Sequence, residues 1–475
     1  VTTNSLTPGW TDFTRRVNYQ TYDVTPLLVE KENVIGAILA DGWYAGYVGP
    51  KELSNPRNRE LYGDTTALRC QLELTYTNGE QEIIATDTTW QASSGPIRYA
   101  DLLMGEVYDA RLEKPGWNKP GYSAGKWQQP LARNLVAEIE DGATLQAYPG
   151  NPIQPYAKIA TVAITEPVTG TYIFDLGQNF AGHARLAIKG NRGDTVTMRF
   201  GEMLNTDGSL MTENLRFARA TDRYVLKGEG LETWEPCFTY HGYRYVEVQG
   251  IAQQPTHDMI TGIAQSSATP MISSFHSSDS LINRLYQNIR WTQRSNFLEV
   301  PTDSPQRDER LGWLGDAQIF SRSALYNADL SAFYKKWFAD VRDAQYDFGA
   351  YANFAPRPYP ELVWYSPGWM EAGVMVPYNA WQFSGDTSLI GDHYESMTRY
   401  MDFAIDKSQK SGGFYPENSW TEIGPNGGFG DWLSLTDKHV AHDLMASLYL
   451  IHSLRIMEEM SNALGYLTKA TYYQK

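Results

Sequence analysis

The spacing of apolar residues changes near residue 275, and this change constrains the fold more than any other feature of the chain. Before it, short stretches alternate between apolar and polar residues, which is the pattern of half-buried β-strands. After it, Ile282, Leu285, Tyr286 and Ile289 follow the i, i+3, i+4, i+7 spacing of one helix face. The sequence therefore predicts a β-rich N-terminal part followed by a helical domain.

The β-rich part is expected to form two sandwiches, because short strands alternate with turn signals throughout it. The first sandwich covers 1–140 and includes a hairpin at Asn78-Gly79, a dipeptide that favours a tight two-residue turn. The second covers 155–270, after a stretch rich in Pro and Gly at 115–155 that marks the boundary. Its predicted strands include 171–174, 184–188, 195–200, 223–226 and 245–248.

The third region, 275–475, is expected to contain successive αα-hairpins. Ser277 or Ser278 is the predicted N-cap of its first helix, and Gly385 and Gly465 are typical of helix C-termini. Further helices are predicted at 317–327, 331–346, 371–384, 388–407 and 439–462. About six helices could form a compact bundle or the first half of a closed helical toroid.

Composition excludes several classes of protein. The formal net charge of -15 disfavours binding to a phosphate backbone, so no nucleic-acid partner is expected. Only Cys70 and Cys237 are present, which excludes a disulfide framework, and no apolar run is long enough to cross a bilayer. Aromatic residues make up 13% and suit sugar faces, but they suit protein cores equally well.

The segment 301–316 is the densest group of reactive side chains, and it is predicted to be a loop between two helices. It contains four carboxylates: Asp303, Asp308, Glu309 and Asp316. Clustered carboxylates raise one another's pKa, which can keep one of them protonated as a general acid. Glycoside hydrolysis needs such an acid beside carboxylates that stay ionised. The alternative is structural, with Asp316 capping the next helix and the others forming a solvated ion-pair network.

Two other segments combine carboxylates with aromatic residues. Glu371 follows Trp369 near a predicted helix start, where it could serve in a site or simply as an N-terminal helix carboxylate. Asp431 and Trp432 end a Gly-rich segment, which fits a sugar-contacting loop or an ordinary tight turn.

His439 and His442 lie three residues apart on a predicted helix, a spacing that can hold a metal. No third ligand accompanies them, so no metal site is predicted.

Taken together, these segments resemble the α-L-rhamnosidases of glycoside hydrolase family 78. The string at 302–316 is the most specific part of the resemblance, which covers nearly the whole chain. The other matching segments are 8–13, 19–25, 42–44, 105–111, 175–179, 213–216, 238–245 and 430–433. The resemblance implies two β-sandwiches followed by the first half of an (α/α)6 toroid.

The resemblance also implies removal of terminal α-L-rhamnose with inversion at the anomeric carbon. A carboxylic acid would protonate the glycosidic oxygen while a carboxylate activates water on the opposite side. Glu309 is the preferred acid by its spacing to the rest of the motif, with Asp308 and Glu371 as rivals. The residues expected to surround or wall the rhamnose are Asp303, Arg307, Trp313, Asp316, Trp369, Asp431 and Trp432.

The family's general base is expected to be a Glu beyond Lys475, so the chain reads as an internal fragment that lacks both ends. On that reading it is expected to be inactive by itself and to expose apolar helix surface. No cofactor is expected for the reaction. A calcium ion in a sandwich module, near Asp41 or Glu106, is a weaker implication of the resemblance.

Two alternatives stay open. A carbohydrate-binding protein with a degenerate toroid would not need so many carboxylates. Another toroid enzyme, such as a different exo-glycosidase or a polysaccharide lyase, is the third reading; a lyase that acts on an acidic substrate fits poorly with a loop so rich in carboxylates. The aglycone, the oligomeric state and the compartment are not given by the sequence.

Overall fold

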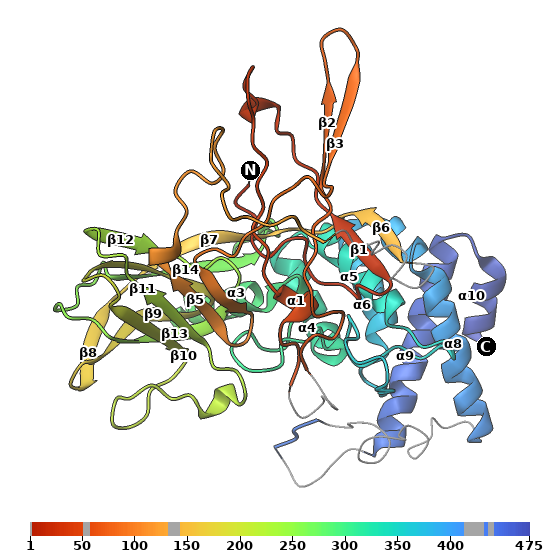
Figure 1. The fold of residues 1–475 in the computed structure, drawn as a ribbon. Coiled ribbons are helices and arrows are strands. Elements are labelled where there is room, and N and C mark those ends of the chain that lie inside the picture. The colour runs from red at the N-terminus through yellow and green to blue at the C-terminus, as the bar shows by residue number, and fades with distance from the viewer. Residues whose placement is uncertain (1, 51–57, 132–142, 413–431, 436–440) are drawn as a thin grey trace.

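The structure is a computed structural model, and it describes residues 2–50, 58–131, 143–412, 432–435 and 441–475. β-strands occupy the N-terminal part and helices the C-terminal part, as the change of period near residue 275 predicts. The sheet and the helices lie side by side (Figure 1). None of the helices in the described ranges is long and apolar enough to span a bilayer.

A ten-stranded sheet dominates the β-rich part. Its order is β4-β5-β11-β10-β13-β9-β14-β7, and β8 and β12 also pair with β9. The strands are β4 (Ile97–Asp101), β5 (Gly105–Asp109), β7 (Ile153–Ala160), β8 (Ala163–Val168), β9 (Thr171–Lys189), β10 (Thr195–Gly201), β11 (Thr221–Val225), β12 (Leu231–Trp234), β13 (His241–Gln249) and β14 (Ile260–Ser267).

Strand β9 joins two of the predicted strands into one. The sequence predicts separate strands at 171–174 and 184–188, whereas β9 runs without a break through 19 residues. It pairs with β13 along its first two thirds and with β14 and β12 along its last part. Gly182 permits the crossing, because a Cβ there would lie 1.9 Å from the Ile263 carbonyl oxygen. Gly182 therefore allows a close approach between the backbones of β9 and β14.

Strands β4 and β5 come from the range assigned to the first module but lie in the ten-stranded sheet. Strand β5 pairs in parallel with β11, and Glu106 N donates to Asp222 Oδ1 at 2.8 Å. Periodicity identifies such strands but not their partners, because pairing depends on residues more than 100 positions away. The module boundaries themselves stay a prediction.

The rest of the N-terminal part contains little regular structure in the described ranges. Strand β1 (Arg16–Tyr19) pairs in parallel with β6 (Thr144–Ala147), and β2 (Gln71–Thr75) pairs with β3 (Gln81–Ala85). The β2–β3 hairpin projects from the body of the molecule (Figure 1), which confirms the predicted hairpin. Its loop has three residues, 77–79, rather than two, because Tyr76 N donates to Glu80 O, and Gly79 has φ 87°. The short helical turns are η1 (Thr25–Leu27), α1 (Gly42–Ala45), η3 (Ala110–Leu112) and η4 (Glu213–Leu215).

The predicted helices are present. They are α3 (Ser280–Asn296), α4 (Leu314–Asn327), α5 (Ser331–Asp343), α6 (Ala372–Ser384), α7 (Ser388–Gly391), α8 (Tyr394–Lys410) and α9 (His442–Ala463). A further helix that the sequence did not predict, α10 (Leu467–Gln474), follows Gly465. The predicted helix at 388–407 is two helices, because the chain turns at Asp392 and buries His393 beside Phe338 and Tyr351.

The start of α3 differs from the prediction. Asp279, not Ser277 or Ser278, caps the helix, and its Oδ1 accepts from the N–H of Leu281 at 2.8 Å. The carboxylate wins because it sits one residue before the first helical turn, where the free N–H groups point. The apolar face predicted for this helix is largely uncovered by the described residues, since Ile282 and Leu285 are 47% and 58% exposed.

Two hydrophobic cores lie on either side of one junction. One fills the sheet, with Phe174, Phe200 and Val246 among its buried residues. The other fills the helical part and also takes in Trp10 and Trp43 from the N-terminal module. The loop at 302–313 contributes Leu311 to the core of the helical part, and it also contacts the β-rich part, where a Cβ on Gly242 would lie 2.9 Å from Gln306 N.

Candidate active site

The loop that carries the four carboxylates connects a two-stranded ladder to helix α4. It leaves β15 (Phe297–Leu298) and β16 (Val300–Pro301) and closes on itself, because Asp303 N donates to Leu311 O and Leu311 N donates to Asp303 Oδ1 at 3.0 Å. The loop ends at Gly312, whose backbone lies so close to Ala355 that a Cβ at this position would be 2.3 Å from the Ala355 carbonyl oxygen. The loop therefore has one defined path despite its polar sequence.

Glu309 lies at the centre of the site with a carboxylate that solvent can reach. Its Oε1 accepts from Trp313 Nε1 at 2.8 Å. Its Oε2 lies 2.8 Å from Arg216 Nη2 and 3.1 Å from Arg307 Nε. The side chain is 12% exposed, so it is held on several sides but open on one. A group held in this way is oriented and still accessible to a ligand.

Asp308, beside it, is completely buried. Its Oδ1 accepts from Arg216 Nε at 2.6 Å, and its backbone oxygen accepts from Arg216 Nη2 at 3.2 Å. The two neighbouring carboxylates thus differ sharply in access. The Asp308 side chain is therefore turned into the protein, whereas part of the Glu309 side chain is exposed to solvent.

Asp303 and Asp316 complete the carboxylate cluster. Burial raises the pKa of Asp303 to about 7, with a further contribution from the negative charge of Glu309. Partial burial and the same glutamate raise the pKa of Asp316, which lies in the first turn of α4. Arg307 Nη2 lies 3.4 Å from Asp303 Oδ2 and limits the repulsion. The loop therefore brings Asp303, Glu309 and Asp316 close enough for their charges to interact.

Aromatic rings wall the cluster. Trp313 packs edge-on against Phe354 and Trp364, with ring centroids 5.2 and 5.5 Å away. Trp369 lies over the first turn of α4, where a Cβ on Gly315 would be 2.6 Å from its ring. The structure therefore brings Trp313 and Trp369 to the same end of α4 as Asp316.

Glu371 is placed differently from the loop carboxylates. It is fully buried at the start of α6, where Oε2 accepts from Gly368 N at 2.6 Å and Oε1 accepts from Tyr400 Oη at 2.7 Å. Burial raises its pKa to about 7. Both of its oxygens are used by neutral donors within the helical core, which is the structural alternative raised from the sequence.

The third predicted segment is only partly described. Asp431 lies outside the described residues, as does His439, and Trp432 is 58% exposed. His442 begins α9.

The two residues linked to a calcium ion have different protein partners. Asp41 pairs with Arg59, whereas Glu106 is buried and accepts from the N–H groups of Cys237 and Phe238. Across the described ranges, no group of three or more His, Cys, Asp and Glu side chains is arranged to hold a metal.

Two residues of the β domain reach the site without having been predicted. Arg216 follows η4, and Glu202 follows β10 and accepts from Asn179 Nδ2 at 2.7 Å. Burial raises the pKa of Glu202, and the positive charge of Arg307 opposes this effect. The segment 213–216 belongs to the family resemblance, but nothing in the sequence says that it touches residues 308 and 309.

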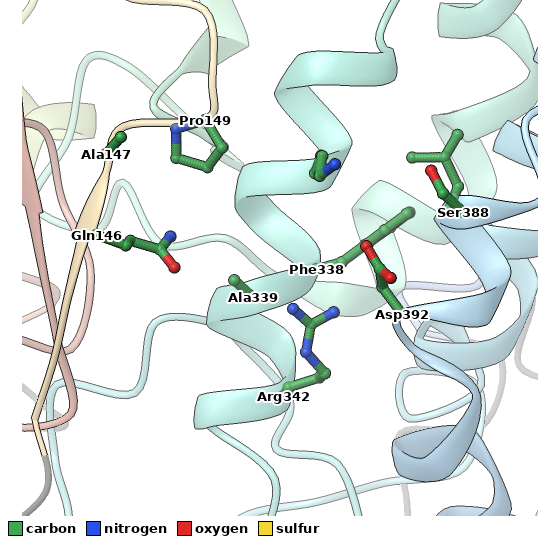
Figure 2. Close-up of a pocket in the computed structure, with 10 residues that line it drawn as sticks. Gln146, Ala147, Pro149, Phe338, Ala339, Arg342, Ser388 and Asp392 are labelled. Atoms are coloured by element: carbon green, nitrogen blue, oxygen red, sulfur yellow. The ribbon is translucent and has the colours of Figure 1, made fainter.

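A separate cavity lies away from the carboxylates, between β6 and helices α5 and α7. It has a volume of about 240 Å³, and Figure 2 shows Gln146, Arg342 and Asp392 among its lining residues. None of the four loop carboxylates lines this cavity. The candidate site at Glu309 is therefore identified by the chemistry of its side chains and not by the cavity.

Three family models match consecutive parts of the chain. The alpha-L-rhamnosidase N-terminal domain matches residues 1–155, the bacterial alpha-L-rhamnosidase concanavalin-like domain matches 165–266, and the bacterial alpha-L-rhamnosidase 6 hairpin glycosidase domain matches 270–475. The chain belongs to the bacterial α-L-rhamnosidase family. The carboxylate loop and Glu371 both fall within the glycosidase domain, and Arg216 falls within the concanavalin-like domain.

Curated relatives and solved structures agree with this family. An alpha-L-rhamnosidase of Streptomyces avermitilis is 40% identical over 468 residues, covering 97% of this chain and 43% of the relative. One from Formosa agariphila is 32% identical, covering 100% and 50%. The crystal structure of the Streptomyces avermitilis enzyme complexed with L-rhamnose superposes with a TM-score of 0.88 at 37% identity, covering all of this chain and 45% of that one. The chain spans about half the length of these relatives.

Proposed function

We propose that this chain carries the acid half of the active site of an inverting α-L-rhamnosidase, with Glu309 as the general acid. The observation that supports this most is the environment of the Glu309 carboxylate. It is oriented by Trp313, Arg216 and Arg307, yet it remains accessible beside Asp303 and Asp316. A general acid must be both positioned and reachable, because it donates its proton directly to the leaving-group oxygen.

Neither rival carboxylate meets both requirements in this structure. Asp308 has no exposed surface and lies against Arg216. Glu371 has no exposed surface either, and its oxygens accept from Tyr400 and Gly368. In the proposal Asp308 fixes the loop and Glu371 fixes the start of α6.

The remaining groups are assigned to the sugar. Asp303 and Asp316 would accept hydrogen bonds from rhamnose hydroxyls, and Arg307 would donate to one while it balances their charge. The faces of Trp313, Trp369 and Trp432 would pack on the C–H groups of the ring. Asp431 stays a predicted sugar ligand. Acid–base hydrolysis needs only carboxyl groups, so the proposal includes no cofactor.

The reaction would proceed in one displacement. Glu309 gives its proton to the glycosidic oxygen as the C–O bond breaks, and water attacks the anomeric carbon from the opposite face. A base takes the proton from that water; by the family resemblance it is a Glu later in the toroid. Carboxyl groups in inverting enzymes stand roughly 6.5–9.5 Å apart to admit the water. The products are free β-L-rhamnose and the alcohol.

The test compares leaving groups in the protein as its own gene encodes it. Wild type, Glu309→Gln and Asp308→Asn are assayed on p-nitrophenyl α-L-rhamnopyranoside and on an alkyl α-L-rhamnoside. An acid role predicts that Glu309→Gln loses far more activity on the alkyl rhamnoside, because that poor leaving group depends on protonation. Equal losses on both substrates would contradict the acid role, and NMR detection of α-L-rhamnose as first product would contradict inversion. Wild-type activity only on another glycoside would remove the rhamnosidase assignment.

A further inference from the structure

Arg216 connects the β domain to the two adjacent carboxylates of the active-site loop. It follows η4 in the concanavalin-like domain, 92 residues before Asp308. Its Nε donates to Asp308 Oδ1 at 2.6 Å, and its Nη2 donates to Glu309 Oε2 at 2.8 Å. One planar guanidinium therefore sets the positions of two side chains that point in different directions.

The contact of Arg216 with the loop has a buried end at Asp308 and an accessible end at Glu309. Asp308 is completely buried, so the charge that anchors Arg216 is shielded from water and only weakly screened. The Arg216 side chain itself is 36% exposed and reaches the open side of Glu309. The buried end of this pair holds the arginine in place, and the accessible end is left to orient Glu309.

A second arginine makes the same connection in the opposite direction. Arg310, on the active-site loop, donates through Nη1 to the carbonyl oxygens of Leu102 and Tyr240 in the β-rich part, at 2.7 and 2.8 Å. Its guanidinium also lies over the Tyr240 ring, 4.5 Å from the centroid. Arg216 of the β domain thus contacts the active-site loop, and Arg310 of that loop contacts the β-rich part.

The backbone at both arginines is unusual. Arg216 has φ 54° and Arg310 has φ 56°, a region that side chains with a Cβ seldom occupy. Such conformations persist where the surroundings determine them, and they concentrate at functional sites.

We propose that Arg216 is a positioning residue, which holds the Glu309 carboxyl group in the orientation needed to protonate the glycosidic oxygen and makes that orientation depend on contact with the β domain. This inference rests on the proposed function of Glu309. Arg307 cannot replace Arg216, because it lies on the same loop and contacts Glu309 without attaching it to another domain.

Three variants test the role kinetically: Arg216→Ala, Arg216→Lys, and the matched control Arg185→Ala. Arg185 lies in the same domain with 34% of its side chain exposed and one carboxylate partner, Glu235, at 2.6 Å. On p-nitrophenyl α-L-rhamnopyranoside, kcat of Arg216→Ala should fall about 100-fold with KM changed less than threefold, the loss that a misplaced catalytic group produces. Arg216→Lys should recover only part of it, since one ammonium cannot hold both carboxylates.

Chemical rescue separates positioning from general support of the fold. Millimolar guanidinium should restore several-fold activity to Arg216→Ala and none to Arg185→Ala. Kinetics of Arg216→Ala within twofold of the control, or a loss that follows only the unfolded fraction, would overturn the inference.

Crystal structures make the result independent of the proposed reaction. In Arg216→Ala the Glu309 carboxyl group should leave its place beside Trp313, whereas an unchanged Glu309 would overturn the inference. If wild type cleaves no rhamnoside, the proposed function fails, and the crystal structure still decides whether Arg216 positions Glu309.

Discussion

Glu309 and Glu371 are both glutamates in aromatic-rich segments of the glycosidase domain, and their surroundings are opposite. Glu309 lies among charges, between two arginines and near two aspartates, and part of it is exposed. Glu371 lies among neutral donors and is fully buried. The first environment leaves part of the carboxyl group accessible to solvent, whereas the second encloses the whole carboxyl group among hydrogen-bond donors of the protein.

The comparison shows why a raised pKa alone does not identify a catalytic group. Burial raises the pKa of Glu371 to about 7, and it does the same to Glu299, which lies under the N-terminal module beside Tyr148 and Lys336. Ion pairs and helix ends in a core perturb carboxyl groups as strongly as active sites do. Access, together with the identity of the neighbours, separates the two kinds of site.

Substitution of Glu309 should have the largest effect on activity. Glu309→Gln should lower kcat about 10²- to 10⁴-fold, the usual contribution of a general acid, and leave the melting temperature nearly unchanged. Glu371→Gln should keep kcat within about threefold, because it lies outside the reacting groups. Steady-state kinetics and thermal unfolding of both variants decide the matter. A large kcat loss in Glu371→Gln with an unaltered melting temperature would exchange the two assignments.

The next effect is on stability. Glu371→Ala leaves the Tyr400 hydroxyl and the Gly368 N–H buried without their acceptor. Such groups cost about 1–3 kcal/mol of unfolding free energy, which urea unfolding can measure. Tyr378→Phe is the matched control, since its hydroxyl also donates to a carboxylate, Glu459 Oε2, but at an exposed position. Equal losses in both variants would show that burial around Glu371 matters little.

The pH dependence of stability sharpens the contrast further. The pKa of Glu371 is about 7 in the folded protein against an ordinary value of 4.5. Because the folded-state pKa is raised, Glu371 contributes its full stabilisation to the free energy of unfolding below a pH of about 4.5. This stabilisation is lost as the pH rises from about 4.5 to 7. The loss should approach about 1.4 kcal/mol per pH unit. Subtracting the profile of Glu371→Gln isolates it, and parallel profiles for wild type and variant would refute it.

The smallest expected effects come from removing one neutral donor at each carboxylate. Trp313→Phe keeps a ring but removes the Nε1 bond to Glu309, and it should lower kcat about fivefold, since one lost hydrogen bond is worth about 1 kcal/mol. Tyr400→Phe should instead lower stability by about 1 kcal/mol and leave kcat alone. Activity loss in Tyr400→Phe without any loss of stability would contradict the separation of the two sites.

Local signals in the sequence predicted the local structure well. The Asn78-Gly79 hairpin and the helices from α4 to α9 follow from turn chemistry and apolar spacing, which act within a few residues. Errors arise where distant residues decide. The long β9 depends on four partner strands, and β4 and β5 join a sheet built mostly by strands that follow residue 150.

The candidate site divides in the same way. The string at 302–316 contains Asp303, Glu309 and Asp316, and the resemblance identified them as a group. It could not say which of Asp308 and Glu309 is accessible. Asp308 is buried beside Arg216, which the sequence places 92 residues away and only the fold brings to 2.6 Å.

The order of strands and helices, the family, and the loop that carries the carboxylates can therefore be read from the amino-acid sequence. These depend on residue type and short spacing, which the chain encodes locally. Only the folded structure shows that the Glu309 side chain is partly exposed, whereas the side chains of Asp308 and Glu371 are buried. It also shows that Arg216 of the β domain contacts both Asp308 and Glu309. Access and charge pairing are set by whichever surfaces fold against a residue, and no local pattern records them.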